Sequence, residues 1–241
     1  MTNNQFPSTP QLIIFDLAGT TVKDNRDVHR VLQAALLDHG VEITLNDANE
    51  VMGIPKPVAI EKLLLDNHRG RKPITEDWIL DIHQNFVSKM REFYLSDPGV
   101  AEVDGASETF ALLKLKGIKI GVDTGFDRAI TTPLLARMGW VEKGLIDVSI
   151  TSDEVPRGRP YPDMIHKAMN VTGVNDPSRV AKVGDTPSDM MEGTSAKCGW
   201  VIGVTSGAFT RAELSKERHT HLVDNISQVL EVIKIHSNTI A

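Results

Sequence analysis

A short apolar segment near the N-terminus, Leu12 to Phe15, ends abruptly in the carboxylate of Asp16. An apolar run of this length, bounded by polar and turn residues, predicts a strand buried on both faces. Asp16 would then stand at the carboxyl end of that strand, where open α/β sheets place their ligands. Gly19 lets the chain turn close to a bound group, and Thr20 offers a hydroxyl and an N–H to an anion. By itself the segment is equally consistent with a plain strand followed by a turn.

Two later segments repeat this pattern of an apolar strand that ends in polar residues. Residues 118–123 predict a strand that runs into Thr124, whose hydroxyl and neighbouring N–H groups could hold a phosphoryl oxygen. Residues 180–184 predict another, which runs into Asp185 with Asp189 four residues on. Carboxylate oxygens at such a position suit Mg²⁺. The bland alternatives are a strand-end turn at Thr124 and helix capping by the two aspartates.

A glycine- and proline-rich loop between those two segments supplies positive charge. It carries Arg157 and Arg159, and either guanidinium could clamp a phosphoryl group and shield the charge of Asp16. The order along the chain is therefore carboxylate, hydroxyl, cation and carboxylate pair.

Strands and helices alternate through most of the chain, which predicts an α/β fold with a doubly wound, mostly parallel sheet. Further strands are expected at 147–151, 200–204 and 221–223. Residues 22–97 differ, because they show helical periodicity and no strand signal. The sequence thus predicts a core domain from residues 1–21 and 98–241 and a helical cap domain from residues 22–97.

Composition excludes several classes of function. The chain has 241 residues and a net charge of −6, which argues against a nucleic-acid or membrane-surface binder. The single Cys198 suits a reducing compartment. Residues 1–10 look like a loose leader without the basic and apolar regions of a signal peptide, and no run is long enough to cross a bilayer. A cytoplasmic protein is expected. His29 and the other histidines lack a second ligand set at metal spacing.

The four ordered motifs together resemble the haloacid dehalogenase superfamily of aspartate-nucleophile hydrolases. The resemblance implies that Asp16 attacks phosphorus and forms an aspartyl-phosphate. It also implies that Asp16 and Asp185 hold Mg²⁺, with Asp189 supporting them. The phosphoryl group would be bound by Thr20, Thr124, Gly125 and Arg159. For the cation, the family pattern favours Arg159 over Arg157. The segment 22–97 resembles the small helical cap of one subgroup.

Position 18 departs from most of that superfamily, whose phosphatases carry a second aspartate there to protonate the leaving oxygen. Here it is Ala18, which leaves only a backbone carbonyl as a metal ligand. The pattern Asp-x-Ala-Gly-Thr-Thr at 16–21 and the segment 155–162 resemble the phosphonatase (phosphonoacetaldehyde hydrolase) branch. That branch breaks a P–C bond through an iminium on a cap lysine, so the leaving group is a neutral enamine that needs no acid at position 18.

The matching lysine is Lys56, in a Met-Gly-x-x-Lys pattern that begins at Met52 and Gly53. Met52, Gly53 and Phe126 are expected to contact the substrate. The alternative is that Lys56 is a solvated cation before a helix. Three features depart from authentic phosphonatases: Ala59 replaces a histidine, Phe126 replaces a tyrosine, and residues 23–27 replace a segment of small residues after the first motif.

The resemblance predicts an Mg²⁺-dependent hydrolase that acts on a small phosphonate or phosphate. One alternative is a phosphomonoesterase of the phosphoglycolate phosphatase type. Another is a non-catalytic phosphate-binding or aspartyl-phosphate switch protein, which Ala18 would favour because hydrolysis would be slow. Relatives with this cap often dimerise through it, so a homodimer is also considered.

Overall fold

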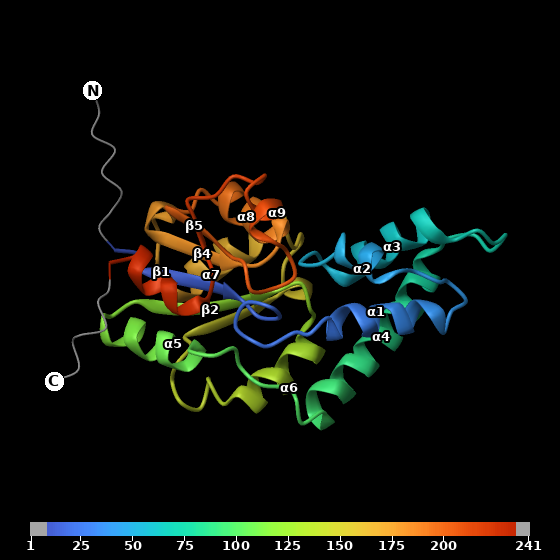
Figure 1. The fold of residues 1–241 in the computed structure, drawn as a ribbon, viewed down its shortest axis with the longest axis horizontal. Helices are drawn as coiled ribbons and strands as arrows, with labels where there is room; N and C mark the ends of the chain where they lie inside the picture. The colour runs from blue at the N-terminus through green and yellow to red at the C-terminus, as the bar shows by residue number, and fades with distance from the viewer. Residues whose placement is uncertain (1–8, 235–241) are drawn as a thin grey trace.

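The computed structural model describes residues 9–234, so most of the expected leader and residues 235–241 lie outside the described part. Six strands form one parallel sheet in the order β3-β2-β1-β4-β5-β6 (Figure 1). Their bounds are β1 (Leu12–Asp16), β2 (Lys119–Thr124), β3 (Val148–Thr151), β4 (Val180–Gly184), β5 (Trp200–Val204) and β6 (His221–Val223). This order confirms the predicted fold class, with the first motif on a central strand.

Side chains of β1 alternate between two hydrophobic clusters, because successive residues of a strand point to opposite faces. Ile13 and Phe15 belong to the cluster that contains Phe110. Leu12 and Ile14 belong to the cluster that contains Met164 and Ile165. All five residues of β1 are buried. Burial on both faces explains why this strand is a continuous apolar run.

Helices on both faces of the sheet complete the core. They are α5 (Ala106–Leu115), α6 (Arg128–Met138), α7 (Asp163–Thr172), α8 (Pro187–Ser195), α9 (Arg211–Leu214) and α10 (Val229–Val232). Short 3₁₀ turns are η1 (Ser152–Glu154), η2 (Pro177–Arg179) and η3 (Ile226–Gln228). The sequence did not predict α9, which is too short for a periodic pattern. η3 is followed directly by α10, the last helix in the described part of the chain.

Segment 22–97 is fully described and contains four helices and no strand. They are α1 (Asp27–Leu37), α2 (Leu45–Asn49), α3 (Lys56–Asn67) and α4 (Glu76–Ser96). In Figure 1 these helices stand beside the carboxyl end of the sheet, and α4 packs against α6. The division into a core and a cap domain remains our proposal.

The two connections between sheet and helices lie together. Val22 forms isolated β-bridges with Ala18 and Glu102, so the outgoing and returning chains meet beside the end of β1. No helix among residues 9–234 is long and apolar enough to cross a membrane.

Candidate active site

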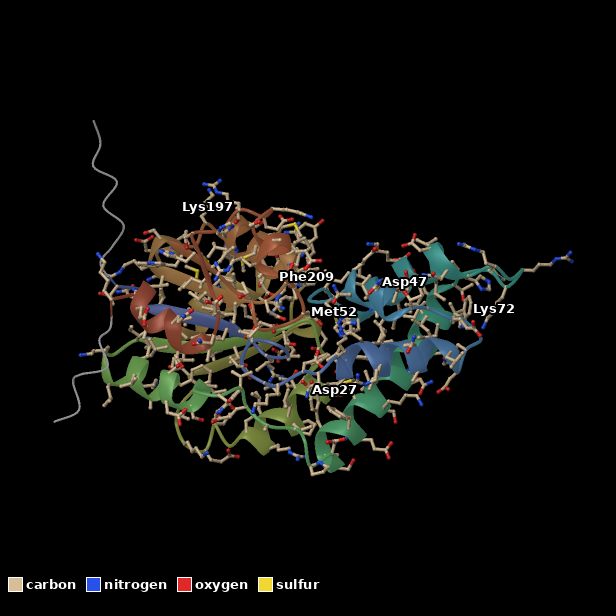
Figure 2. The ribbon with its side chains drawn as sticks, viewed as in Figure 1. Asp27, Asp47, Met52, Lys72, Lys197 and Phe209 are labelled. Atoms are coloured by element: carbon tan, nitrogen blue, oxygen red, sulfur yellow. The ribbon has the colours of Figure 1, made fainter. Side chains whose placement is uncertain are left out.

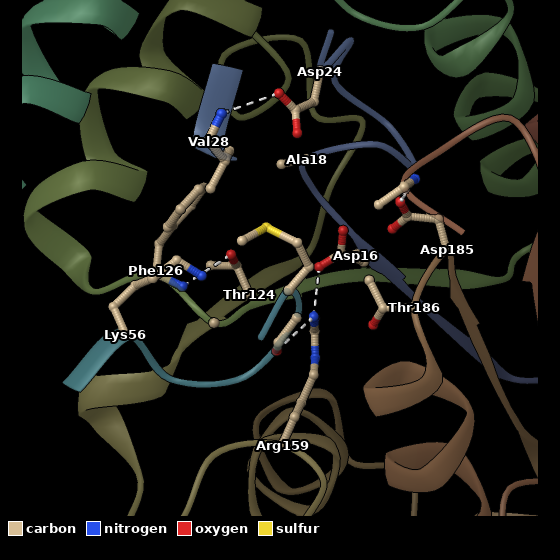
Figure 3. Close-up of a pocket in the computed structure, with 14 residues that line it drawn as sticks. Asp16, Ala18, Asp24, Val28, Lys56, Thr124, Phe126, Arg159, Asp185 and Thr186 are labelled. Atoms are coloured by element: carbon tan, nitrogen blue, oxygen red, sulfur yellow. Dashed lines mark hydrogen bonds and ion pairs between the residues drawn. The ribbon is translucent and has the colours of Figure 1, made fainter. Parts of the chain in front are cut away.

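Three predicted residues meet at the carboxyl edge of the sheet. Asp16 is the last residue of β1, Thr124 is the last residue of β2, and Asp185 follows β4 directly. All three line one pocket together with Ala18 (Figure 3). Parallel strands bring their carboxyl ends to one edge, which is why residues more than 160 positions apart converge here.

The turn after β1 fits tightly against Asp185. Gly19 has φ +91°, and a Cβ at this position would collide with the Asp185 side chain. Thr20 donates its hydroxyl to Asp185 Oδ1 at 3.1 Å, and Thr21 donates to the Asp16 carbonyl at 2.8 Å. Thr20 therefore contacts a carboxylate and does not line the pocket, although the sequence suggested that it binds substrate.

Arg159 is the cation that reaches Asp16. Its side chain is fully buried, and Nη1 lies 2.7 Å from Asp16 Oδ1. Nη2 donates to the Asp123 carbonyl at 2.8 Å and contacts the carboxylate of the same residue. Arg157 instead is 58% exposed, pairs with Asp163 and stacks on an aromatic ring. The geometry thus separates the two arginines that the sequence left in competition.

Behind Arg159 lies a buried charge cluster that sequence reasoning missed. Lys182 on β4 is fully buried and contacts Asp123, with Nζ 3.2 Å from Asp189 Oδ1 and 3.0 Å from Glu192 Oε2. Arg159 lies 3.1 Å from each of the last two carboxylates. A lysine inside an otherwise apolar strand was the available signal, since Lys is almost never fully buried unless paired.

The pKa values of these side chains depend on their burial and on the number of charged groups around them. Burial raises the pKa of Asp16 to about 6, although the Arg159 guanidinium lowers it. Burial also raises the pKa of Glu192 to about 8, with Asp123 adding to the rise. The pKa of Lys182 lies above its usual range because three carboxylates surround the ammonium and outweigh burial and the neighbouring Arg159.

Asp189 sits at the first turn of α8 in a capping box with Thr186. Thr186 Oγ1 donates to Asp189 Oδ2 at 2.6 Å, while the Asp189 N–H donates back at 3.3 Å. Asp189 Oδ1 is left to face Arg159 at 3.1 Å. The Asp189 side chain therefore caps α8 with one oxygen and contacts Arg159 with the other.

Two sets of carboxylates could hold a divalent cation. Asp16, Asp123 and Asp189 each place an oxygen within 4.8 Å of the others, but Arg159 and Lys182 already contact the last two. The predicted set of Asp16, Asp185 and the Ala18 carbonyl fits better, because it includes a buried carboxylate without a cation.

Asp185 is that carboxylate. It is fully buried, and in the described part of the chain it has no cationic side chain within 4.0 Å. Its oxygens accept only from Thr20 and from the Ala208 N–H, at 2.6 Å for the latter. Burial, followed by the neighbouring Asp16 and Asp189, holds its pKa well above the usual range. A hard dication beside Asp16 and Asp185 would relieve this excess of negative charge.

The cap contributes Lys56, Met52 and Gly53 to the same pocket, and Figure 2 shows Met52 where the cap meets the core. Lys56 is the first residue of α3 and is only 3% exposed, so it is not a solvated cation before the helix. Its Nζ lies 5.3 Å from the centre of the Phe126 ring and 5.9 Å from that of Phe86. Burial lowers its pKa to about 8, against the opposing effect of Asp16. Such an amine is partly neutral near physiological pH.

The loop after β2 packs directly against the cap. A Cβ on Gly125 would lie 2.7 Å from the Ile54 carbonyl oxygen and 2.9 Å from that of Gly53. Thr124 Oγ1 accepts from the Phe126 N–H at 3.2 Å, which leaves the hydroxyl proton free for a ligand. Core and cap therefore close together around one pocket.

The comparisons with known proteins agree with this geometry. Residues 10–197 match the family model of the haloacid dehalogenase-like hydrolases. A phosphonoacetaldehyde hydrolase from Bacillus cereus is 34% identical over 207 residues, which cover 82% of this chain and 76% of that protein. A phosphonoacetaldehyde hydrolase from Parabacteroides distasonis is 33% identical over 204 residues, which cover 81% of this chain and 76% of that protein. A phosphonoacetaldehyde hydrolase-like protein from Oleispira antarctica superposes with a TM-score of 0.83 at 23% identity over 97% of this chain and 95% of that one. This last likeness shows the fold.

Proposed function

The chain belongs to the haloacid dehalogenase-like hydrolases, and we propose that it cleaves the carbon–phosphorus bond of a small phosphonate aldehyde through an aspartyl-phosphate at Asp16. The observation that carries the proposal is Lys56, a buried amine in the same pocket as the candidate nucleophile. A lysine with a pKa of about 8 can react with a carbonyl group at neutral pH. The relatives from Bacillus cereus and Parabacteroides distasonis are named phosphonoacetaldehyde hydrolases, so phosphonoacetaldehyde is the substrate to test.

The first step is imine formation. The neutral Lys56 amine adds to the aldehyde carbon, and uptake of one proton from solvent with loss of water gives an iminium between Nζ and the substrate. Phe86 and Phe126 exclude bulk water from this nitrogen and face it with their rings. The iminium draws electrons from the adjacent P–C bond.

The second step is displacement at phosphorus. An Asp16 oxygen forms a bond to phosphorus while the P–C electron pair moves into the iminium, which becomes a neutral enamine. Arg159 pairs with Asp16 Oδ1 at 2.7 Å and keeps this carboxylate ionised and oriented. Thr124 can donate its free proton to a phosphoryl oxygen. Water then hydrolyses the aspartyl-phosphate, and the enamine is protonated and hydrolysed to free Lys56.

Mg²⁺, when bound by Asp16, Asp185 and the Ala18 carbonyl, would neutralise charge on the phosphoryl oxygens. Ala18 itself has no acid to offer a leaving alkoxide. This fits departure of an enamine, which needs no proton, better than departure of an alcohol from a phosphate ester. We also propose that the protein acts in the cytoplasm and that it is capable of forming a homodimer through the cap.

The test is borohydride trapping of the lysine adduct. Wild-type protein with Mg²⁺ and phosphonoacetaldehyde is reduced, and the modified residue is located by mass spectrometry. We expect the adduct at Lys56 and its loss in Lys56→Met, with Lys62→Met, an exposed position on the same helix, as the control. Turnover of phosphate esters with no lysine adduct would refute the proposal and favour a phosphomonoesterase.

A further inference from the structure

The cap side of the pocket holds a second charged group, Asp24, to which the proposed reaction assigns no role. This residue lies in the connection between β1 and α1 and lines the pocket together with Ala18 and Lys56. Its side chain is only 9% exposed. A carboxylate that is desolvated in this way needs hydrogen-bond donors for both of its oxygens.

One oxygen of Asp24 is committed to the start of α1. Oδ1 accepts from the Asp27 N–H at 2.6 Å and from the Val28 N–H at 3.2 Å. These bonds satisfy two of the free N–H groups at the helix start and fix the carboxylate in one orientation. Figure 3 shows the result: one oxygen is bonded to Val28, and the other is directed toward Ala18 and the pocket.

The second oxygen faces another acceptor. His29 is 1% exposed, and its Nε2 is hydrogen-bonded to Asn49 Oδ1 at 2.9 Å, which makes Nε2 the protonated nitrogen. The other nitrogen, Nδ1, has no hydrogen-bond partner in the described structure and lies 4.0 Å from Asp24 Oδ2. Burial lowers the pKa of His29, so the neutral ring is favoured. On the side of His29, Asp24 Oδ2 therefore faces an acceptor and not a donor.

We propose that Asp24 determines specificity, because its free oxygen accepts a hydrogen bond from a protonated amine or a hydroxyl on the carbon chain of the substrate. A ligand that carries such a donor can bond to Oδ2, which accepts no hydrogen bond from the described residues and is open to the pocket. A methyl group leaves that oxygen unsatisfied, and a carboxylate is repelled by it. The inference rests on the proposed function, because it takes the phosphoryl group to lie at Asp16.

Lys56 is the competing determinant in this half of the pocket. As a cation it would attract a carboxylate and repel an amine, which is the opposite preference. Its nitrogen lies over two aromatic rings, and its one hydrogen-bond acceptor is the Ile54 carbonyl at 3.5 Å. The terminal group that binds best therefore distinguishes control by Asp24 from control by Lys56.

The experiment is calorimetric titration of Mg²⁺-loaded protein with four phosphonates that differ only in the terminal group. Aminoethyl-, hydroxyethyl-, propyl- and carboxyethyl-phosphonate carry an ammonium, a hydroxyl, a methyl and a carboxylate. We expect the amine or the hydroxyl to bind about tenfold more tightly than propylphosphonate, since hydrogen bonds to charged groups have this magnitude. The two arms also show which donor is preferred.

Asp24→Asn and Asp24→Ser should reduce that preference to within about threefold, because both residues still cap a helix but lack the charge. Asp27→Asn, which removes a carboxylate at the same helix start but outside the pocket, should retain it. Inorganic phosphate should bind all variants equally. Equal binding of amine, hydroxyl and methyl compounds by the wild type, tightest binding of the carboxylate, or an unchanged preference in both Asp24 variants would each overturn the inference. Failure to turn over any phosphonate aldehyde would refute the proposed function, while the binding order would still decide the role of Asp24.

Discussion

Arg159 and Lys182 are two buried cations among four buried carboxylates, so each of them offsets more than one negative charge. Removing one partner from a buried ion pair leaves the other charge uncompensated, which is far more harmful than removing both. At the scale of single residues, this asymmetry predicts the sign of several substitutions.

Lys182→Met should lower the free energy of unfolding by about 3 kcal/mol or more, because Asp123 and Glu192 lose their ammonium partner. Urea denaturation measures the change, with Lys116→Met on the surface as the control. Adding Asp123→Asn should restore part of the loss, since the pKa of Asp123 is lowered and its carboxylate is the charge left without its ammonium partner. Full additivity of the two effects would contradict this view of the cluster.

Lys56→Met should raise the free energy of unfolding, whereas Lys182→Met lowers it. The folded pKa of about 8 lies below the ordinary lysine value of 10.5, so the unfolded chain binds the proton more tightly and burial of this lysine destabilises the fold below pH 8. We expect Lys56→Met to raise the free energy of unfolding by roughly 2 kcal/mol at pH 7 while activity is lost. The advantage of the variant should shrink as the pH rises from 8 to 10.5, which denaturation at several pH values will show. A constant difference across this range would argue against a depressed pKa.

At the scale of elements, the closest contact between core and cap joins the loop after β2 to the turn before α3. Gly125→Ala places a methyl group 2.7 Å from a backbone carbonyl of the cap, and neither backbone can rotate away as a side chain could. We expect the cap to be displaced, with KM for the phosphonate aldehyde raised about tenfold or more and a smaller effect on thermal stability. Gly70→Ala is the control, because its methyl would meet only the His68 side chain. An unchanged KM would show that this contact does not set cap closure.

The strand ends were predictable because each carries its own local signal, an apolar run that stops at a polar residue. Asp16, Thr124 and Asp185 needed no tertiary information to be singled out. Glu192 and Lys182 were not predicted, because their importance comes from contacts with residues of other motifs. A lysine in an apolar strand signals that Lys182 must be paired, but its partners on other elements are set by tertiary packing and leave no local pattern.

Charged residues at the start of a helix, such as Lys56 and Asp24, were harder to interpret from the sequence than residues at strand ends. The sequence suggested Lys56 as a cation that reacts or is solvated, and only burial by Phe86 and Phe126 decides against solvation. Asp24 gave no signal of its own, since an aspartate before a helix is ordinarily a cap. Its second oxygen becomes informative only when the pocket is known.

At the scale of the whole molecule, one hydrophobic cluster runs from the core into the cap. It joins Phe15 and Phe110 of the core to Phe86 of α4, with Phe126 lying 6.3 Å from Phe86 between ring centres. The pocket therefore lies on a continuous packed surface and not on a flexible appendage. Ligand binding at the pocket should consequently raise the free energy of unfolding of the entire fold.

Mg²⁺ should stabilise the protein, since a ligand that binds only the folded state adds about 2.7 kcal/mol when present at a hundred times its Kd. For a chain of this size, that corresponds to a rise in Tm of about 5 to 10 °C. Asp185→Asn should abolish the rise. Without metal the variant should be at least as stable as the wild type at pH 7, because burial beside Asp16 raises the pKa of Asp185 and makes its charge unfavourable. Thermal melts with Mg²⁺ or with EDTA measure both effects. Asp123→Asn provides the matched comparison: if that variant lost the Mg²⁺ effect while Asp185→Asn kept it, the ion would belong to the cluster around Arg159 and Lys182, and the assignment to Asp16 and Asp185 would be wrong.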